Sequence, residues 1–197
     1  MLAAVEPTKI DWPKRPASKL KAAANGHRDF AINRKGRLTI REARTDEALA
    51  IVEFTSTVLR GKAHCSQSSF SSVEDVEQLM CSGKFLLAES EKQVIGCAYL
   101  APRLEASRLE LLAVTPSLQR AGIGSQLLEA AERLSSSMHC SFMHLRVSNL
   151  HWEAIRFCRR RGYVEFGLEP LSGTQPTSLH CHIVRMCKRL EKDRWAF

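Results

Sequence analysis

The part of the chain that most constrains its fold runs from Leu109 to Leu134, where a strand-like run, a glycine loop and an amphipathic helix follow one another. The run from Leu109 to Pro116 is largely apolar, as in a strand buried within a sheet. Gly122 and Gly124 then lead into the helix, and glycine permits backbone angles and close approaches that other residues resist. Backbone N–H groups and the positive end of a helix therefore converge on one point, which is an arrangement that binds phosphate.

The helix after this loop has one apolar face. Its apolar residues recur at helical spacing and predict packing against a sheet: Ile123, Leu127, Leu128, Ala131 and Leu134. The loop does not match two common phosphate motifs. A dinucleotide fingerprint needs a third glycine and an acidic residue about 20 positions later, and a Walker loop needs a lysine after its last glycine. Neither is present, which argues against nucleotide hydrolysis.

Together, the strand, loop and helix resemble the coenzyme A loop of the GNAT superfamily, the acetyl-CoA-dependent N-acetyltransferases. The family motif is Arg or Gln, two residues, Gly, one residue, then Gly or Ala, after a strand ending in Val-x-Pro. The matching residues are Val114, Pro116, Gln119, Gly122 and Gly124. The resemblance covers most of the chain, roughly residues 38–190. It implies an α/β fold with a mixed, mostly antiparallel sheet of about six or seven strands and helices on both faces.

The same resemblance implies that acetyl-CoA binds as a cosubstrate. Its diphosphate would lie against the loop residues Gln119, Arg120, Ala121, Gly122, Ile123, Gly124 and Ser125. The pantetheine arm would pair with the main chain of Leu112, Ala113 and Val114, where this strand splays from the next one. The N–H group of Val114 would then stabilise the oxyanion. Asn149 and His151 are competing candidates for further pantetheine contacts, and His151 is equally a candidate second base or simply the start of a helix.

Glu110 is the candidate general base. An alkyl ammonium is mostly unreactive at neutral pH, so a nearby base is useful. A carboxyl group among apolar neighbours has a raised pKa unless it is paired, which suits this role. The alternative is that Glu110 points to solvent or pairs with Arg108 or with a residue on an adjacent strand.

Cys158 occupies the position where the family places its general-acid tyrosine. The family pattern in the last helix is Asn, two residues, Ala, three residues, Tyr, three residues, Gly. Counting back from Gly162 puts Cys158 on the tyrosine and His151 on the asparagine. A thiol can in principle protonate the departing CoA thiolate. Free cysteines are commonly core residues, however, and we favour that interpretation.

Charge divides the chain into unequal parts. Of the formal net charge of +8, residues 1–37 carry +6, with nine basic and three acidic residues. We interpret 1–37 as a basic, flexible segment, 38–190 as the acetyltransferase domain and 191–197 as a tail. A transit peptide and a nuclear localisation signal are alternatives for the first segment, and a cytoplasmic protein is otherwise expected.

Seven cysteines without a Cys-x-x-Cys pair indicate reduced thiols rather than a disulfide framework. His180, Cys181 and His182 lack further ligands at zinc-like spacing, so no metal is expected. No apolar run is long enough to span a bilayer, so no membrane partner is expected either.

The expected function is transfer of an acetyl group from acetyl-CoA to a primary amine of a protein or small molecule, by direct attack in a ternary complex. The acceptor is left open, and its site is expected to border residues 171–178. The alternatives are a non-catalytic acyl-CoA-binding or regulatory module and, less favoured, a nucleic-acid-associated protein that uses the basic segment. A monomer and a homodimer are both compatible with the sequence.

Overall fold

The computed structural model describes residues 29–32, 38–59, 70, 72–170 and 182–190. In chain order, the elements are β1 (Asp29–Ile32), β2 (Thr39–Glu42), the 3-10 turn η1 (Thr45–Glu47), α1 (Ala48–Val58), α2 (Val73–Ser82), β3 (Lys84–Ser90), β4 (Gln93–Pro102), β5 (Ala106–Val114), the 3-10 turn η2 (Pro116–Leu118), α3 (Ile123–Ser137), β6 (Phe142–Ser148), α4 (Trp152–Arg160), β7 (Val164–Pro170) and β8 (His182–Arg189).

All eight strands form one sheet in the order β1-β2-β3-β4-β5-β6-β8-β7. Every neighbouring pair is antiparallel except β5 and β6, which are parallel. The expected mixed, mostly antiparallel sheet is confirmed, and seven of its strands, β2–β8, lie within the predicted domain 38–190. An eighth strand, β1, pairs with β2 and lies inside the segment 1–37 that we expected to be flexible. Its sequence, Asp-Phe-Ala-Ile, does not alternate between polar and apolar residues, so the pattern did not indicate a strand.

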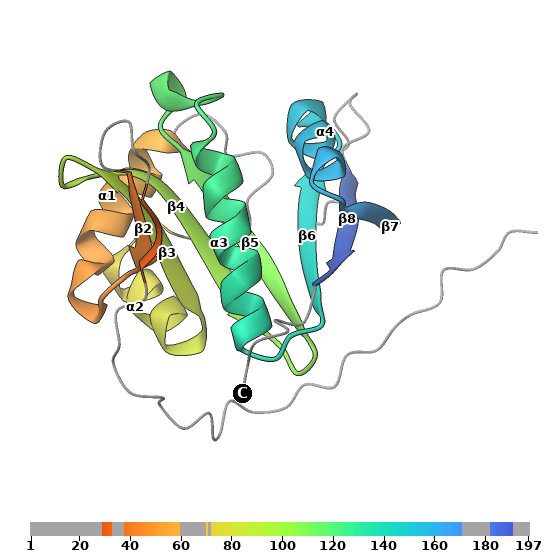
Figure 1. Cartoon of the computed structure of the whole chain (residues 1–197), viewed down its shortest axis with the longest axis horizontal. Coiled ribbons are helices and arrows are strands. Elements are labelled where there is room, and N and C mark those ends of the chain that lie inside the picture. Colours follow the sequence, from red (N-terminus) through yellow and green to blue (C-terminus); the bar gives the residue numbers. More distant parts are fainter. Residues whose placement is uncertain (1–28, 33–37, 60–69, 71, 171–181, 191–197) are drawn as a thin grey trace, which may run out of the picture.

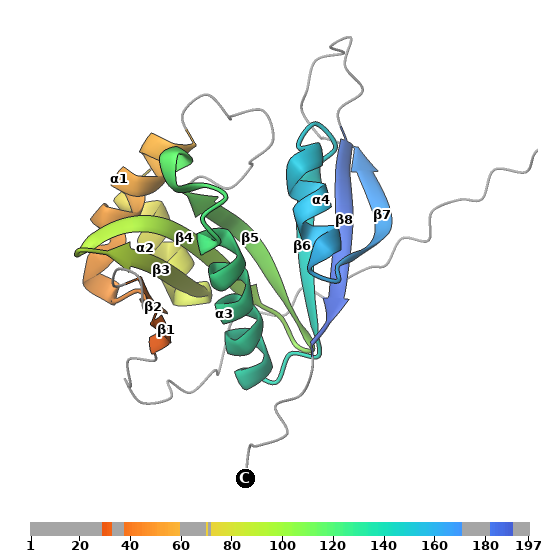
Figure 2. The same ribbon diagram turned by 45° about the horizontal axis from the view of Figure 1, so that its top comes forward.

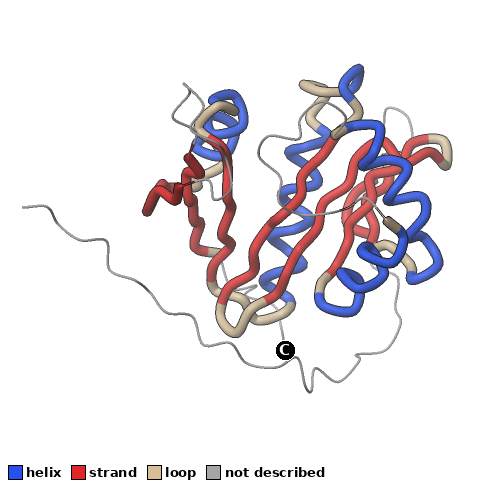
Figure 3. Tube along the Cα trace, turned by 180° about the vertical axis from the view of Figure 1, so that it is seen from behind, coloured by secondary structure: helices blue, strands red, loops and turns tan. Residues whose placement is uncertain are grey.

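Helices lie on both faces of the sheet, as expected. α3 and α4 lie on one face (Figure 1), and the reverse view in Figure 3 shows α1 and α2 on the other. The predicted apolar face of α3 is confirmed, because all of its predicted residues are buried against the sheet. A second apolar cluster packs between the sheet and α1 and α2, where Phe70, Phe85 and Tyr99 are in edge or tilted ring contact.

A β-bulge in β5 divides the strand between these two clusters. Tyr99 of β4 pairs with Leu111, whereas Leu100 pairs with Leu109, so Glu110 is the additional residue on β5. Leu109 accordingly packs on the α3 side, and Leu111 packs on the side of α1 and α2. A bulge bends its strand and re-aims side chains, and here it lies within the expected active site.

Candidate active site

β5 and β6 pair over only part of their length. Their last paired residues are Leu109 and Leu145, after which the two strands diverge. Figures 1 and 2 show both strands meeting at one end and separating toward the end near α4 and the loop before α3. We call this divergence the fork. The splayed strands that the resemblance implied are therefore present, and among the described residues no other strand pairs with β5 beyond Leu109 on this edge.

The hydrogen-bond alternation of β5 indicates which main-chain groups point into the fork. The N–H of Thr115 donates to the carbonyl oxygen of Ile95 on β4, at 2.9 Å. Alternate residues of an antiparallel strand face opposite edges, so Val114 and Leu112 turn their N–H and carbonyl groups toward the fork. Ala113 turns toward β4 instead. Of the three residues that we expected to pair with pantetheine, Leu112 and Val114 have the required direction.

The loop before α3 has five consecutive N–H groups without a partner. Positive φ angles at Arg120 (66°) and Gly122 (86°) turn the chain into α3. Within the described residues, no hydrogen bond is donated by the N–H groups of residues 120–124. These donors lie at the positive end of the α3 dipole, so the loop is suited to bind an anion.

The side chains of this loop are already engaged. Gln119 Nε2 donates to the carbonyl oxygen of Val114 at 3.2 Å, so it points back onto β5. Arg120 is exposed and pairs with Glu153 of α4 at 3.4 Å. Ser125 Oγ accepts a hydrogen bond from the guanidinium of Arg161. The two contacts to α4 cross from one side of the fork to the other.

Glu110 is paired, as the alternative interpretation expected. Arg108 Nε donates to Glu110 Oε1 at 2.7 Å, and the Glu110 side chain is 20% exposed. The carboxylate therefore lies at the bulge beside the fork with a guanidinium attached to it. A catalytic role for Glu110 stays a prediction.

Cys158 is a core residue of α4. Its side chain belongs to the apolar cluster beneath α3. Burial raises the pKa of its thiol to about 11, so the thiol stays protonated at neutral pH and donates its proton reluctantly. The preferred structural interpretation of Cys158 agrees with this position, and its role as general acid stays an unfavoured prediction.

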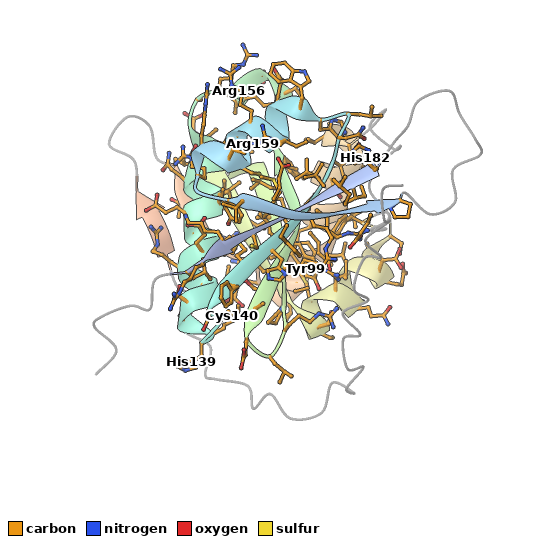
Figure 4. The ribbon with its side chains drawn as sticks, turned by 90° about the vertical axis from the view of Figure 1, so that its right-hand side faces the viewer. Tyr99, His139, Cys140, Arg156, Arg159 and His182 are labelled. Atoms are coloured by element: carbon orange, nitrogen blue, oxygen red, sulfur yellow. The ribbon has the colours of Figure 1, made fainter. Side chains whose placement is uncertain are left out.

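His151 and Asn149 lie at the end of the fork nearest α4. His151 is exposed and precedes α4, where its carbonyl oxygen accepts the N–H of Ala154 at 2.9 Å. Asn149 exchanges two hydrogen bonds with the main chain of His182, which begins β8 (Figure 4): Asn149 Oδ1 accepts at 3.0 Å and Asn149 N–H donates at 2.9 Å. Asn149 therefore holds β8 beside β6, and His151 is the more accessible of the two for a ligand.

The sequence reasoning missed a charged group on the face opposite α3 and α4. Arg146 and Arg185 are directly paired residues of β6 and β8, and Glu169 of β7 binds both. Their signal in the sequence is weak, because an arginine within a strand usually points to solvent. Only the register of three strands brings these side chains together.

Some expectations fall on residues outside the described ranges. These are the acceptor-bordering residues 171–178, His180, Cys181, the tail 191–197 and, apart from β1, the segment 1–37. In the part of the chain that the structure describes, no group of three or more His, Cys, Asp or Glu side chains is placed to hold a metal ion. None of the described helices combines the length and apolar character needed to cross a bilayer.

Comparisons with known proteins agree with the resemblance drawn from the sequence. The profile of the acetyltransferase (GNAT) domain matches residues 81–165. An amino-acid acetyltransferase from Pseudomonas putida is 30% identical over 135 residues, which cover 67% of this chain and 29% of that protein. This chain therefore spans less than a third of the length of that relative.

Solved structures agree in fold. The ribosomal-protein-alanine N-acetyltransferase from Brucella melitensis superposes with a TM-score of 0.65 at 20% identity, covering 77% of this chain and 99% of that one. A GNAT family acetyltransferase from Elizabethkingia anophelis with acetyl-CoA bound gives a TM-score of 0.54 at 20% identity, over 60% of this chain and 84% of that one. The chain therefore matches the GNAT acetyltransferase domain over residues 81–165 and shares the fold of these GNAT acetyltransferases.

Proposed function

We propose that this protein transfers the acetyl group of acetyl-CoA to a primary amine by direct attack within a ternary complex. The observation that carries the proposal is the row of unpartnered N–H groups at residues 120–124 beside the fork. The diphosphate would occupy the N–H groups, and the pantetheine arm would run into the fork along Leu112 and Val114. This route delivers the thioester to the end of β5.

The chemistry needs three events at the fork. A deprotonated amine attacks the thioester carbonyl, forming a C–N bond, and the N–H of Val114 is directed to stabilise the oxyanion. The tetrahedral intermediate then breaks its C–S bond and releases the CoA thiolate. The amine also loses a proton, for which Glu110 is the candidate acceptor. No covalent acetyl-enzyme is required.

The relative named an amino-acid acetyltransferase supports a small amine as acceptor, and the ribosomal-protein-alanine acetyltransferase supports a protein amine. The rival proposal is a non-catalytic acyl-CoA-binding module. It is favoured by Cys158, because the buried thiol replaces an accessible tyrosine acid. A CoA thiolate is a tolerable leaving group, so this replacement need not abolish transfer.

Two measurements separate the proposals. Titration calorimetry with coenzyme A tests the loop, and absence of binding by a folded sample would overturn both ideas. Thiol release from acetyl-CoA over a panel of amino acids, polyamines and peptides tests transfer. Binding of CoA without amine-dependent thiol release would leave the non-catalytic module as the better account.

A further inference from the structure

Two arginines face each other directly across β6 and β8. Arg146 and Arg185 are paired residues of this antiparallel ladder, and like charges in that position destabilise a sheet. Glu169 of β7 lies against both, at 2.8 Å from Arg146 Nη2 and 3.2 Å from Arg185 Nε. One carboxylate neutralises only one of the two guanidinium groups, so the group keeps one positive charge in excess.

This pair lies at the fork. Arg146 immediately follows Leu145, the last residue of β6 that pairs with β5. Leu145 and Val184 belong to the apolar cluster under α3, and side chains alternate along a strand. Arg146 and Arg185 therefore point to the opposite face, the one that α1 and α2 cover over β3–β5. No described helix covers β6, β8 and β7 on that face (Figure 3).

The arginine pair is held in place by its surroundings. The guanidinium of Arg185 lies over the ring of Phe166, 4.5 Å from the ring centre, and its side chain is 25% exposed. Stacking of this kind restricts a guanidinium while leaving its N–H groups available at the edge. The planar guanidinium group of an arginine matches a carboxylate in geometry and charge.

The charged groups around this face are unbalanced toward positive. Arg108 and Glu110 neutralise each other in an ion pair, which leaves the excess charge of the arginine pair. His144 is two residues before Arg146 on the same face, and its directly paired neighbour on β8 is Cys187. The pKa of His144 is lowered by burial and by the charges of Arg185 and Arg108. A neutral imidazole adds no charge of its own, so the excess positive charge of this face comes from the arginine pair.

We propose that the acceptor amine carries a carboxylate on the same small molecule, and that Arg146 and Arg185 bind this carboxylate at the fork. The inference rests on the proposed function, because it places the reacting amine beside the thioester. A polyamine would bring further positive charge to a face that already has an excess, so it is the acceptor least suited to this site. An amino-acid-type acceptor satisfies both the arginine pair and the chemistry.

The test compares acceptors that differ in one carboxylate. Alanine, alaninamide and spermidine are assayed with acetyl-CoA at pH 7.5. We expect kcat/KM for alanine to exceed that for the amide by about 10-fold or more, as for a lost charge-assisted contact. The amide has the less basic amine and so has more of it deprotonated at this pH, which biases the comparison against the expected result. Equal kcat/KM values, or spermidine as the best acceptor, would overturn the proposal.

Variants assign the effect to the pair. Arg185→Gln and Arg146→Gln should each raise KM for alanine about 10-fold while changing kcat/KM for alaninamide by less than about 2-fold. The control is Arg156→Gln, which removes the same charge from an arginine on α4 (Figure 4) that has no ion pair among the described residues. The two variants should unfold at urea midpoints close to that of the parent, because each loses a part-exposed ion pair with Glu169 together with a like-charge contact. A large loss of stability in both variants would mark the pair as structural and contradict the proposal.

A binding measurement covers the case in which no acceptor is acetylated. Glutarate, which has two carboxylates and no amine, is titrated calorimetrically into the protein saturated with coenzyme A. We expect a dissociation constant of about 1 mM or tighter, weakened by Arg185→Gln. Absence of heat in a sample that binds CoA would overturn the carboxylate site alone, whereas failure of CoA to bind would overturn the proposed function.

Discussion

The two parts of the sheet differ in how they are covered. β3–β5 have α3 on one face and α1 and α2 on the other, and their central residues, such as Leu87 and Leu100, have no exposed surface. Among the described helices, α3 and α4 cover β6, β8 and β7 on one face and none covers the other, and β7 exposes Val164 and Leu168. We call these the covered part and the open part.

The difference in cover suggests that the two parts of the sheet contribute differently to folding stability and to ligand recognition. The covered part buries apolar surface on both faces, which is the main source of folding free energy. The open part keeps Arg146, Arg185, Glu169 and His144 on the face that no described helix covers, where they cost less desolvation than in a core. The fork lies between the two parts, so in the proposed reaction the thioester would lie between the packed covered part and this charged face.

The largest expected effect tests this contrast in stability. Leu127 of α3 is fully buried over β4, and its replacement in Leu127→Ala removes packing that cannot collapse easily. We expect a loss of about 3 kcal/mol in the free energy of unfolding. The control is Leu168→Ala in the open part, where the side chain is 65% exposed and a change within about 0.5 kcal/mol is expected. Urea denaturation of both variants decides, and similar losses would remove the distinction between the parts.

Glu110→Gln tests the boundary. We expect CoA affinity to be retained and turnover at neutral pH to fall by about 100-fold or more, as for loss of a general base. Glu129→Gln, on the exposed surface of α3, is the charge-matched control and should turn over like the parent. Steady-state thiol release gives both values. Parental turnover in Glu110→Gln would remove this carboxylate from the mechanism and leave the proton to another acceptor.

Gly122→Ala tests the anion loop. At a φ of 86°, an added Cβ costs about 1 kcal/mol or more of stability, and it also intrudes where the diphosphate is expected. We expect CoA binding measured by calorimetry to weaken about 10-fold or more. Gly162→Ala is a close control, because Gly162 has a φ of 85° at the end of α4. It should lose similar stability and keep its CoA affinity, and equal loss of affinity in both variants would point to strain rather than to the site.

The sequence predicted the parts of the site that depend on the backbone. The glycine loop, the helix after it and the strand before it follow from local pattern, and all the apolar residues predicted for the buried face of α3 are buried. The sequence could not decide whether Glu110 is paired, because pairing with Arg108 depends on which side chains a bulge brings to one face. The Arg146–Arg185 pair could not be predicted from the sequence for a related reason. It depends on the register of β6, β8 and β7 rather than on spacing along the chain.

Burial of Cys158 has a smaller expected effect, on the reactivity of its thiol. Because the thiol is buried and its pKa is raised to about 11, little thiolate is present at pH 8, and alkylation should be slow in the native protein. Cys81, which is exposed on α2, should react first. Mass spectrometry after iodoacetamide treatment measures the order in which the two thiols react.

Turnover of Cys158→Ala should equal that of the parent. A large loss of turnover with unchanged CoA affinity would restore the thiol as a proton donor.

The smallest effect concerns how the free energy of unfolding changes at acidic pH, and it involves the Arg41–Glu47 ion pair beside the covered part. Glu47 receives two hydrogen bonds from Arg41, at 2.6 and 2.8 Å, and these contacts hold the pKa of Glu47 below its ordinary value of 4.5. A carboxyl group with a lowered pKa in the folded state stabilises the protein above its unfolded pKa, and this contribution is lost as the pH falls through the folded value. Unfolding free energies measured between pH 7 and pH 3 should therefore fall less steeply for Glu47→Gln than for the parent. Asp46→Asn, at an exposed neighbouring carboxylate, should leave the slope unchanged. Identical slopes in the parent and Glu47→Gln would show that the Arg41–Glu47 contact does not contribute to the acid sensitivity of the protein.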